Sequence, residues 1–177
     1  MNFVGIDLSL TSTGICNLGS PSIISTKSKG PERLYSVSKE VLNYCLNIKN
    51  SFVLIEGYSF ASRNSQAHSI GELGGCVRML LWESNIPFIE IPPKCRAKFA
   101  TGKGNAGKSE VISSISAKTG IVWSGPGADD MCDAWVLEEM GLARVGKSQY
   151  DWPLTNMSAL DNVDWSSLDE FIGKEHS

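Results

Sequence analysis

The chain has 177 residues, 42% of them hydrophobic, and a formal net charge of −3 at pH 7, which suits one compact domain and by itself gives no sign of a nucleic-acid partner. No apolar run approaches the roughly 20 residues that span a bilayer, and the start lacks a basic segment followed by an apolar one, so we expect neither a membrane partner nor a signal peptide. The five cysteines are too far apart for a disulfide framework or a thiolate metal site, and we expect free thiols in a reducing cytoplasm.

Strands dominate the first part of the predicted order. Residues 2–17 contain two apolar segments separated by small polar residues, which predicts a β-hairpin whose first strand ends on Asp7. Residues 22–26 predict a third strand, and residues 31–50 have apolar side chains at helical spacing with a proline in the first turn. The apolar run 52–55 predicts a buried central strand that leads directly into Glu56. A carboxylate at the end of a buried strand is destabilising unless another group pairs with it.

Helices alternate with one further strand in the second part. A long helix is expected over residues 65–85, and its glycines at 71, 74 and 75 lower its intrinsic stability. Small residues in mid-helix indicate close approach of another backbone, either that of the chain's own sheet or that of a second copy across a dimer seam. Further elements are expected in this order: a strand over 86–91, a basic helix to about 100, a loop over 101–107, and helices over 108–119 and 128–144. The alternation predicts an α/β or α+β sheet covered by helices.

Charge divides the chain into two parts. Residues 1–145 carry 14 basic and 13 acidic side chains, whereas residues 146–177 carry 2 and 6. Within the first part, one segment is basic without an intervening acid: Lys94, Arg96, Lys98, Lys103 and Lys108. Such a segment beside separate acids is typical of an enzyme that holds a polyanion over a metal site, although a solvated loop with chance charges has the same composition. We predict a main domain over 1–145 and an acidic C-terminal tail over 146–177, either a packed appendage or a partner-binding or DNA-mimicking segment.

The last predicted helix begins with three acids. Asp130 and Asp133 are three residues apart and share a helix face, which Asp129 could also share. The helix dipole favours such acids by only ~0.3–1 kcal/mol each, and carboxylates this close repel each other unless a cation neutralises them. Carboxylate ligands without His or Cys select hard cations such as Mg²⁺ or Mn²⁺. If this helix crosses the strand ends, its acids meet Asp7 and Glu56 in one pocket. Four carboxylates suit two metals ~4 Å apart, an arrangement for phosphodiester hydrolysis.

These motifs resemble those of a known family. Gly5-Ile-Asp7 with Thr13-Gly14, then Ile55-Glu56, then Asp130-Met-Cys-Asp133-Ala134, are similar in order and spacing to RuvC-like Holliday junction resolvases of bacteria or bacteriophages, over about residues 1–143. The resemblance implies an RNase H-like α/β fold, with a central mixed sheet of about five strands flanked by helices. It implies a homodimeric crossover junction endodeoxyribonuclease that resolves branched DNA by paired symmetric nicks in recombination and repair, in the cytoplasm of a bacterium or of a phage host. Two Mg²⁺ per site, or Mn²⁺ as substitute, are expected on Asp7, Glu56, Asp130 and Asp133.

The same resemblance implies roles in DNA binding. Lys98 and Lys108 resemble the family's basic residues near the scissile phosphate, and Lys108 is expected to offset charge in the transition state. Phe60 resembles an aromatic residue that stacks at the opened branch point, although a phenylalanine of the core or of a loop fits the sequence too. We predict the following DNA-binding residues: Phe60, Arg63, Arg96, Lys98, Lys103 and Lys108. Asp129 departs from the family pattern as an extra acid that could replace or assist Asp130.

Other functions match single features. Residues 102–109 fit the P-loop pattern GxxxxGK[ST], but that pattern needs a buried strand directly before it, and basic, helix-like residues precede it here. Residues 7–11 faintly resemble the first phosphate loop of sugar kinases and actin-like ATPases, which are about twice this size. We therefore expect no nucleotide cofactor. Two alternatives stay open: another RNase H-like nuclease that acts on RNA–DNA hybrids, and a junction-binding protein without catalysis.

Overall fold

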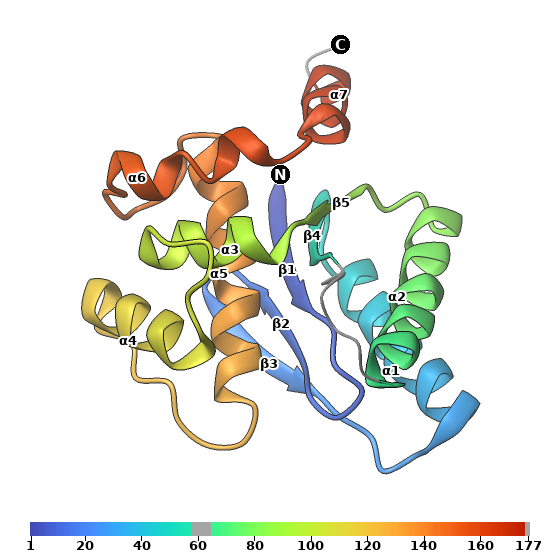
Figure 1. Cartoon of the computed structure of the whole chain (residues 1–177). Helices are drawn as coiled ribbons and strands as arrows, with labels where there is room; N and C mark the ends of the chain where they lie inside the picture. Colours follow the sequence, from blue (N-terminus) through green and yellow to red (C-terminus); the bar gives the residue numbers. More distant parts are fainter. Residues whose placement is uncertain (58–64, 176–177) are drawn as a thin grey trace.

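A computed structural model of the chain describes residues 1–57 and 65–175, without the side chains of 65–67 and 175. Its centre is a five-stranded sheet in the order β3-β2-β1-β4-β5 (Figure 1). The strands are β1 (Asn2–Asp7), β2 (Thr13–Asn17), β3 (Ser20–Ile24), β4 (Ser51–Glu56) and β5 (Phe88–Ile91). The first three form an antiparallel meander, and β4 and β5 extend it in parallel with β1. The mixed sheet of five strands confirms the predicted fold class.

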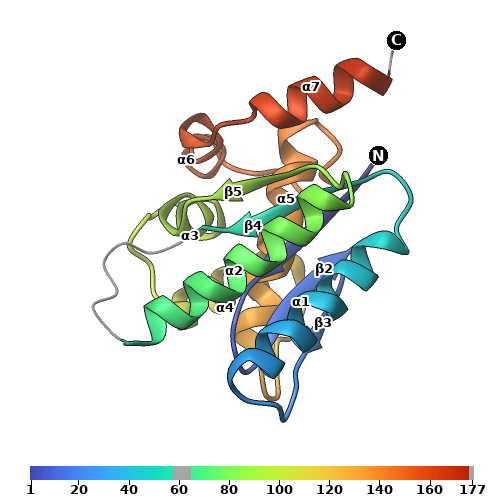
Figure 2. The ribbon, with the colours of Figure 1, turned by 90° about the vertical axis from the view of Figure 1, so that its right-hand side faces the viewer.

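Helices cover both faces of this sheet. They are α1 (Gly30–Leu46), α2 (Ser65–Glu83), α3 (Pro93–Thr101), α4 (Lys108–Thr119), α5 (Ala128–Arg144), α6 (Leu154–Met157) and α7 (Ser166–Glu175), with a 3₁₀ turn, η1, at Leu160–Asn162. Helices α1 and α2 lie on one face, and α5 crosses the other with α3 and α4 beside it (Figures 1 and 2). Among the described residues, no helix has both the length and the apolar character needed to cross a membrane.

Alternating side chains of the strands supply two cores, as expected for a sheet covered on both faces. Val4 and Ile6 of β1 face the core under α1 and α2, whereas Phe3 faces the larger core under α5. Most expected elements are present with ends shifted by a few residues. The strand β3 begins earlier than predicted because Leu18 and Gly19, at φ 53° and 70°, form a two-residue hairpin turn. The five cysteines are free thiols, as expected, and all but one are buried.

Two glycines let α5 lie directly on the sheet. A Cβ added at Gly5 would lie 2.0 Å from the carbonyl oxygen of Ala134, and a Cβ at Gly14 would lie 2.0 Å from the carbonyl oxygen of Asp130. Both distances are far below the 3.4–4 Å of ordinary contact, and both neighbours are backbone atoms. Any larger residue at either of these two positions would therefore hold the helix and its acids away from the sheet.

The acidic C-terminal segment packs on the α5 side of the molecule. Buried apolar side chains of this segment join the larger core: Trp152, Leu160, Val163, Trp165 and Leu168. The ring of Trp152 lies 4.4 Å from that of Phe99 on α3, and α7 brings Phe171 within 5.6 Å of Phe52 on β4. Its acids lie mostly on the surface, where Asp169 pairs with Arg144 at 3.1 Å. The division of the chain at residue 145 stays a prediction.

Candidate metal centre

Two neighbouring parallel strands end in acids at the same edge of the sheet. Ile6 of β1 pairs with Ile55 of β4, so the next residues, Asp7 and Glu56, come side by side. Helix α5 crosses this edge and adds Asp133, whose side chain is almost fully buried. Carboxylate oxygens of these three residues all lie within 4.8 Å of one another. We refer to Asp7, Glu56 and Asp133 as the acid cluster.

Within the described part of the chain, one oxygen of the acid cluster has no protein partner. Asp133 Oδ2 is buried and accepts no hydrogen bond from any residue that the structure describes. A buried acceptor left without a donor is destabilising, and for a charged group the penalty is larger. A hard divalent cation would satisfy this oxygen together with those of Asp7 and Glu56, because such cations prefer carboxylate ligands. The residues present therefore fit a divalent metal ion.

Asp130 lies next to the acid cluster and is held by two donors. The hydroxyl of Ser12 donates to Asp130 Oδ2, and Lys108 Nζ donates to Asp130 Oδ1 at 3.1 Å. Lys108 also donates to Asp129 Oδ2 at 2.6 Å, on the more exposed side. Asp130 is buried and Asp129 is exposed at its side chain to 38%. The buried acid beside the cluster is thus Asp130, and Asp129 pairs with Lys108 at the rim.

Arg96 enters the acid cluster from α3. Its Nε donates to Glu56 Oε2 and its Nη1 donates to Asp133 Oδ1, while Nη2 lies 3.5 Å from Glu56 Oε1. The residue is only 8% exposed. The DNA contact that its place in a basic segment predicts for Arg96 stays a prediction; in the structure its side chain points inward and bridges two of the acids. Charge composition gives the sign of a segment, and not the direction in which each side chain points.

Electrostatics of the site follow from burial and crowding. Burial, with Glu56 and Asp133 adding repulsion, raises the pKa of Asp7 well above its usual value. Burial raises the pKa of Asp133 to about 7, although Arg96 acts in the opposite direction. The pKa of Arg96 is itself raised, because Glu56 and Asp133 outweigh the effect of its burial. Two carboxylates that resist ionisation in the absence of metal are typical of a site completed by a cation.

The remaining predicted DNA-binding residues are distributed differently. Lys98 is half-buried on α3, and Lys103 is exposed and pairs with Glu110 at 2.9 Å. Phe60 and Arg63 lie outside the described residues. The P-loop-like segment follows α3 and not a strand, with Gly102 as the left-handed cap of that helix. The geometry thus lacks the strand-to-loop step that a P-loop requires.

Some contacts of the site were not predicted from the sequence. Ser12 comes from the polar turn of the first hairpin, where a hydroxyl among several gives no sign of its partner. Glu138, five residues beyond Asp133 on α5, accepts from Cys16 Sγ of β2 at 2.9 Å and from the Gly19 amide at 3.1 Å. This buried acid ties α5 to the β2–β3 turn and takes no part in the acid cluster.

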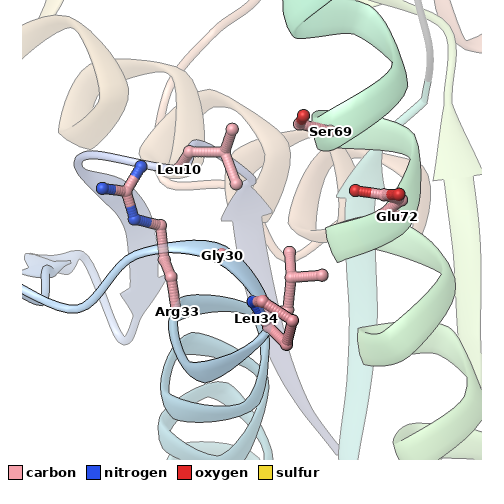
Figure 3. Close-up of a pocket in the computed structure, with 7 residues that line it drawn as sticks. Leu10, Gly30, Arg33, Leu34, Ser69 and Glu72 are labelled. Carbon is pink, nitrogen blue, oxygen red and sulfur yellow. The ribbon is translucent and has the colours of Figure 1, made fainter.

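A separate cavity of about 290 Å³ lies between the first hairpin, the start of α1 and α2. In Figure 3, Ser69 and Glu72 of α2 lie across from Leu10 and Leu34. Arg33 also lines it and donates from Nε to the Ser28 carbonyl at 2.8 Å. Of the described residues around this cavity, none belongs to the acid cluster, and its mixed charge favours no ligand class.

Comparison with known proteins supports one family. No protein-family model matches the sequence. A protein named crossover junction endodeoxyribonuclease RuvC from Carboxydothermus hydrogenoformans is 28% identical over 115 residues, which cover 65% of this chain and 72% of that relative. A protein of the same name from Pseudothermotoga lettingae is 35% identical over 79 residues, 45% of this chain and about half, 49%, of that relative.

Solved structures agree with the fold. The structure of Thermus thermophilus RuvC matches with a TM-score of 0.64 at 22% identity, over 85% of this chain and 100% of that one. The same protein in complex with a Holliday junction substrate matches with a TM-score of 0.63 at 22% identity, over 85% and 99%. Sequence and fold thus agree with the resemblance seen in the motifs: the chain is similar in sequence to two proteins named RuvC, and it shares the fold of Thermus thermophilus RuvC.

Proposed function

We propose that this chain is a divalent-metal-dependent endonuclease that resolves four-way DNA junctions by paired nicks. The observation that carries the proposal is the acid cluster, with oxygens of Asp7, Glu56 and Asp133 within 4.8 Å of one another and a buried Asp133 oxygen that no described residue satisfies. The names of the relatives and the junction-bound neighbour support the substrate. A cytoplasmic setting, where such DNA is found, belongs to the same proposal.

The acid cluster and Asp130 are the proposed metal ligands, with Mg²⁺ as the natural ion, Mn²⁺ as a substitute, and two ions per site. When bound, divalent cations supply Lewis acidity and charge neutralisation for phosphodiester hydrolysis. The donor set supports a hard cation because it consists of carboxylates alone. The burial of Asp133, which disfavours its charged form, gives a further reason for a cation at this position.

Basic side chains at the rim have a proposed role in holding the phosphate. Lys108 is half-exposed, and Asp129 and Asp130 fix its ammonium beside the acid cluster. There it would stabilise charge that develops on the phosphate oxygens as a water oxygen bonds to phosphorus and the bond to the 3′ oxygen breaks. The products carry a 5′-phosphate and a 3′-hydroxyl. Lys98 and Lys103 are proposed phosphate contacts farther along the DNA, and Phe60 with Arg63 stays a proposed contact at the branch point.

A homodimer is the proposed assembly, with α2 as its seam. A Cβ added at Gly71 or Gly75 would meet nothing within 4 Å in the described part of the chain, so the sheet of the same copy does not explain these two glycines, whereas Gly74 is buried. Gly75 is followed one turn later by Met79, which is 59% exposed, and Trp82 is 77% exposed. Small residues beside exposed apolar ones on one helix face favour close packing on a second copy. A two-fold dimer would present one site to each of two opposed strands of a junction.

A cleavage assay tests the proposal. A labelled four-way junction, a duplex, a fork and an RNA–DNA hybrid are each incubated with the protein in Mg²⁺ and in EDTA. We expect paired symmetric nicks in the junction with Mg²⁺ and none in EDTA. Asp7→Asn should abolish cutting and retain junction binding, whereas Asp161→Asn, the same change at an exposed acid, should cut like wild type. Preferential hybrid cutting would indicate an RNase H activity instead, and tight junction binding without cutting would leave a non-catalytic binding protein.

A further inference from the structure

We propose that Arg96 is a resident counter-ion of the metal centre: its guanidinium holds the acid cluster together when metal is absent and competes with metal for the same carboxylates. This inference rests on the proposed function, because it takes the acid cluster to be the metal site. It assigns Arg96 to control of metal affinity and of the stability of the metal-free protein, and not to the contact with DNA that its basic neighbours suggest.

Arg96 occupies carboxylate oxygens of two members of the acid cluster. It donates to Glu56 Oε2 and to Asp133 Oδ1, and approaches Glu56 Oε1 at 3.5 Å. Its three guanidinium nitrogens therefore engage both carboxylates, a fork that a lysine ammonium does not reproduce. Within the acid cluster, a metal ion could bind Asp133 Oδ2 and the carboxylate of Asp7 without displacing this fork. A metal ion that takes a fuller set of cluster oxygens must displace part of this fork.

Arg96 also compensates charge at the acid cluster. The acid cluster and Asp130 place four carboxylates at one edge of the sheet, with Arg96 and Lys108 as the cations that the structure pairs with them. Lys108 is half-exposed and forms ion pairs with Asp129 and Asp130. The charge of Glu56 and Asp133 is therefore compensated by Arg96. Buried charges are tolerated when they are paired, and the removal of one partner leaves the others uncompensated. A divalent cation and the guanidinium would thus each neutralise the negative charge of Glu56 and Asp133.

The backbone of α3 is held in place by the C-terminal segment. Asn156 Nδ2 donates to the carbonyl of Phe99 at 2.7 Å, and the Phe99 ring lies 4.4 Å from that of Trp152. Cys95, on the other side of Arg96, donates from Sγ to the carbonyl of Asn162 at 3.8 Å. The C-terminal segment therefore contacts α3 on both sides of Arg96. Relief of the competition has to come from rotation of the Arg96 side chain, and not from withdrawal of the helix.

Competition predicts linked changes in binding and stability. If Arg96 and metal share oxygens, Arg96→Gln should bind Mn²⁺ more tightly, by roughly the 5- to 150-fold range of coupled sites. The same variant should melt at a lower temperature in EDTA and show a larger rise in melting temperature on addition of Mn²⁺. Arg96→Lys keeps one charge without the fork and should lie between the two. A purely structural role would lower the melting temperature equally with and without metal.

The experiment measures Mn²⁺ affinity by titration calorimetry, and melting temperatures in EDTA and in Mn²⁺, on DNA-free full-length chain. Arg78→Gln is the matched control, since it removes the same charge from a partly exposed ion pair with Glu90 on the other side of the sheet. For variants that fail to fold, the ¹⁵N-detected Nε–H signal of Arg96 in the wild-type chain gives a second readout. That proton should exchange slowly in EDTA and lose protection when Mg²⁺ is added.

The outcomes separate this inference from the proposed function. Unchanged or weaker Mn²⁺ binding by a folded Arg96→Gln variant would overturn the inference and leave the nuclease proposal intact. An Arg96 Nε–H signal that keeps its protection in Mg²⁺ would overturn it too. A wild-type chain that binds no divalent metal would instead remove the proposed function on which the inference rests. Tighter binding with a lower melting temperature in EDTA, absent from Arg78→Gln, would establish the resident counter-ion.

Discussion

Replacement of Gly14 by alanine should disturb the proposed metal centre, although Gly14 has no side chain that could bind metal. Gly14 pairs with Asp7 across β1 and β2, and α5 rests on it. The added Cβ would lie 2.0 Å from the carbonyl oxygen of Asp130 and 2.5 Å from its carbonyl carbon, whereas ordinary contacts begin at 3.4 Å. Because both sides are backbone, the first turn of α5 must move away by about 1 Å or more for the clash to be relieved.

The magnitude follows from that displacement. Overpacking of this kind destabilises a protein by about 1–3 kcal/mol, which a chain of this size should register as a fall in melting temperature of several degrees. The movement falls on Asp130 and its neighbour in the acid cluster, Asp133, and a misplacement of about 1 Å can slow a reaction by about 10²-fold. We therefore expect Gly14→Ala to fold, to bind a four-way junction, and to cleave it about two orders of magnitude more slowly.

Single-turnover cleavage of a labelled junction in Mg²⁺, beside thermal melts, is the assay. Gly173→Ala is the control, because a Cβ at this exposed position in α7 meets no described residue within 4 Å. In a helix that change should be neutral or stabilising by up to about 1 kcal/mol. A Gly14→Ala variant with the cleavage rate and melting temperature of wild type would refute the reasoning that the glycine sets the position of α5.

Three further predictions concern protons and supports of the site. Since burial raises the pKa of Asp133 from 3.8 to about 7, the folded metal-free chain binds this proton more tightly than the unfolded chain does. Its stability in EDTA should therefore fall as the pH rises from about 4 to about 7, by at most about 4 kcal/mol, and Asp133→Asn should flatten that slope in melts. Asn156→Ala removes the donor to the Phe99 carbonyl and should lower the melting temperature by the equivalent of about 1–3 kcal/mol, with the rate of junction cleavage reduced as well; an unchanged rate would mean that α3 needs no such support. Ser12→Ala removes a donor to Asp130 and should weaken Mn²⁺ binding in calorimetry, and unaltered affinity would show that Lys108 alone holds this acid.

Much of the fold follows from local patterns. Asp7 and Glu56 each end an apolar run of strand length, and strands buried by helices on both faces produce such runs. Asp130 and Asp133 share a face because three residues are nearly one helical turn. The sequence even contains the means of bringing them together, since Gly5 and Gly14 are the positions where α5 rests on the sheet. A glycine in a strand has several explanations, however, and only the packed helix identifies this one.

The C-terminal segment illustrates what local patterns leave out. Its acids outnumber its basic residues 6 to 2, and from the sequence it could be either a packed appendage or a partner-binding or DNA-mimicking segment. The structure buries Trp152, Trp165 and Leu168 against α5 and α3, while most of the described acids stay on the surface. Net charge describes the exposed side of such a segment, whereas a few large apolar side chains decide whether it packs.

The contacts of Arg96 depend on the glycines beneath α5 and on the packing of the C-terminal segment. Apolar residues surround it on α3, at Cys95, Ala97 and Phe99, so the helix has no clear polar face that would show which way the arginine points. Its partners come from β4, 40 residues earlier, and from α5, 37 residues later. Asp133 is in place because α5 rests on the two glycines, and Arg96 is in place because the C-terminal segment holds α3. The position of the Arg96 side chain therefore depends on contacts far from it in the sequence. Substitutions that alter this packing should change the metal affinity even though they replace no proposed metal ligand.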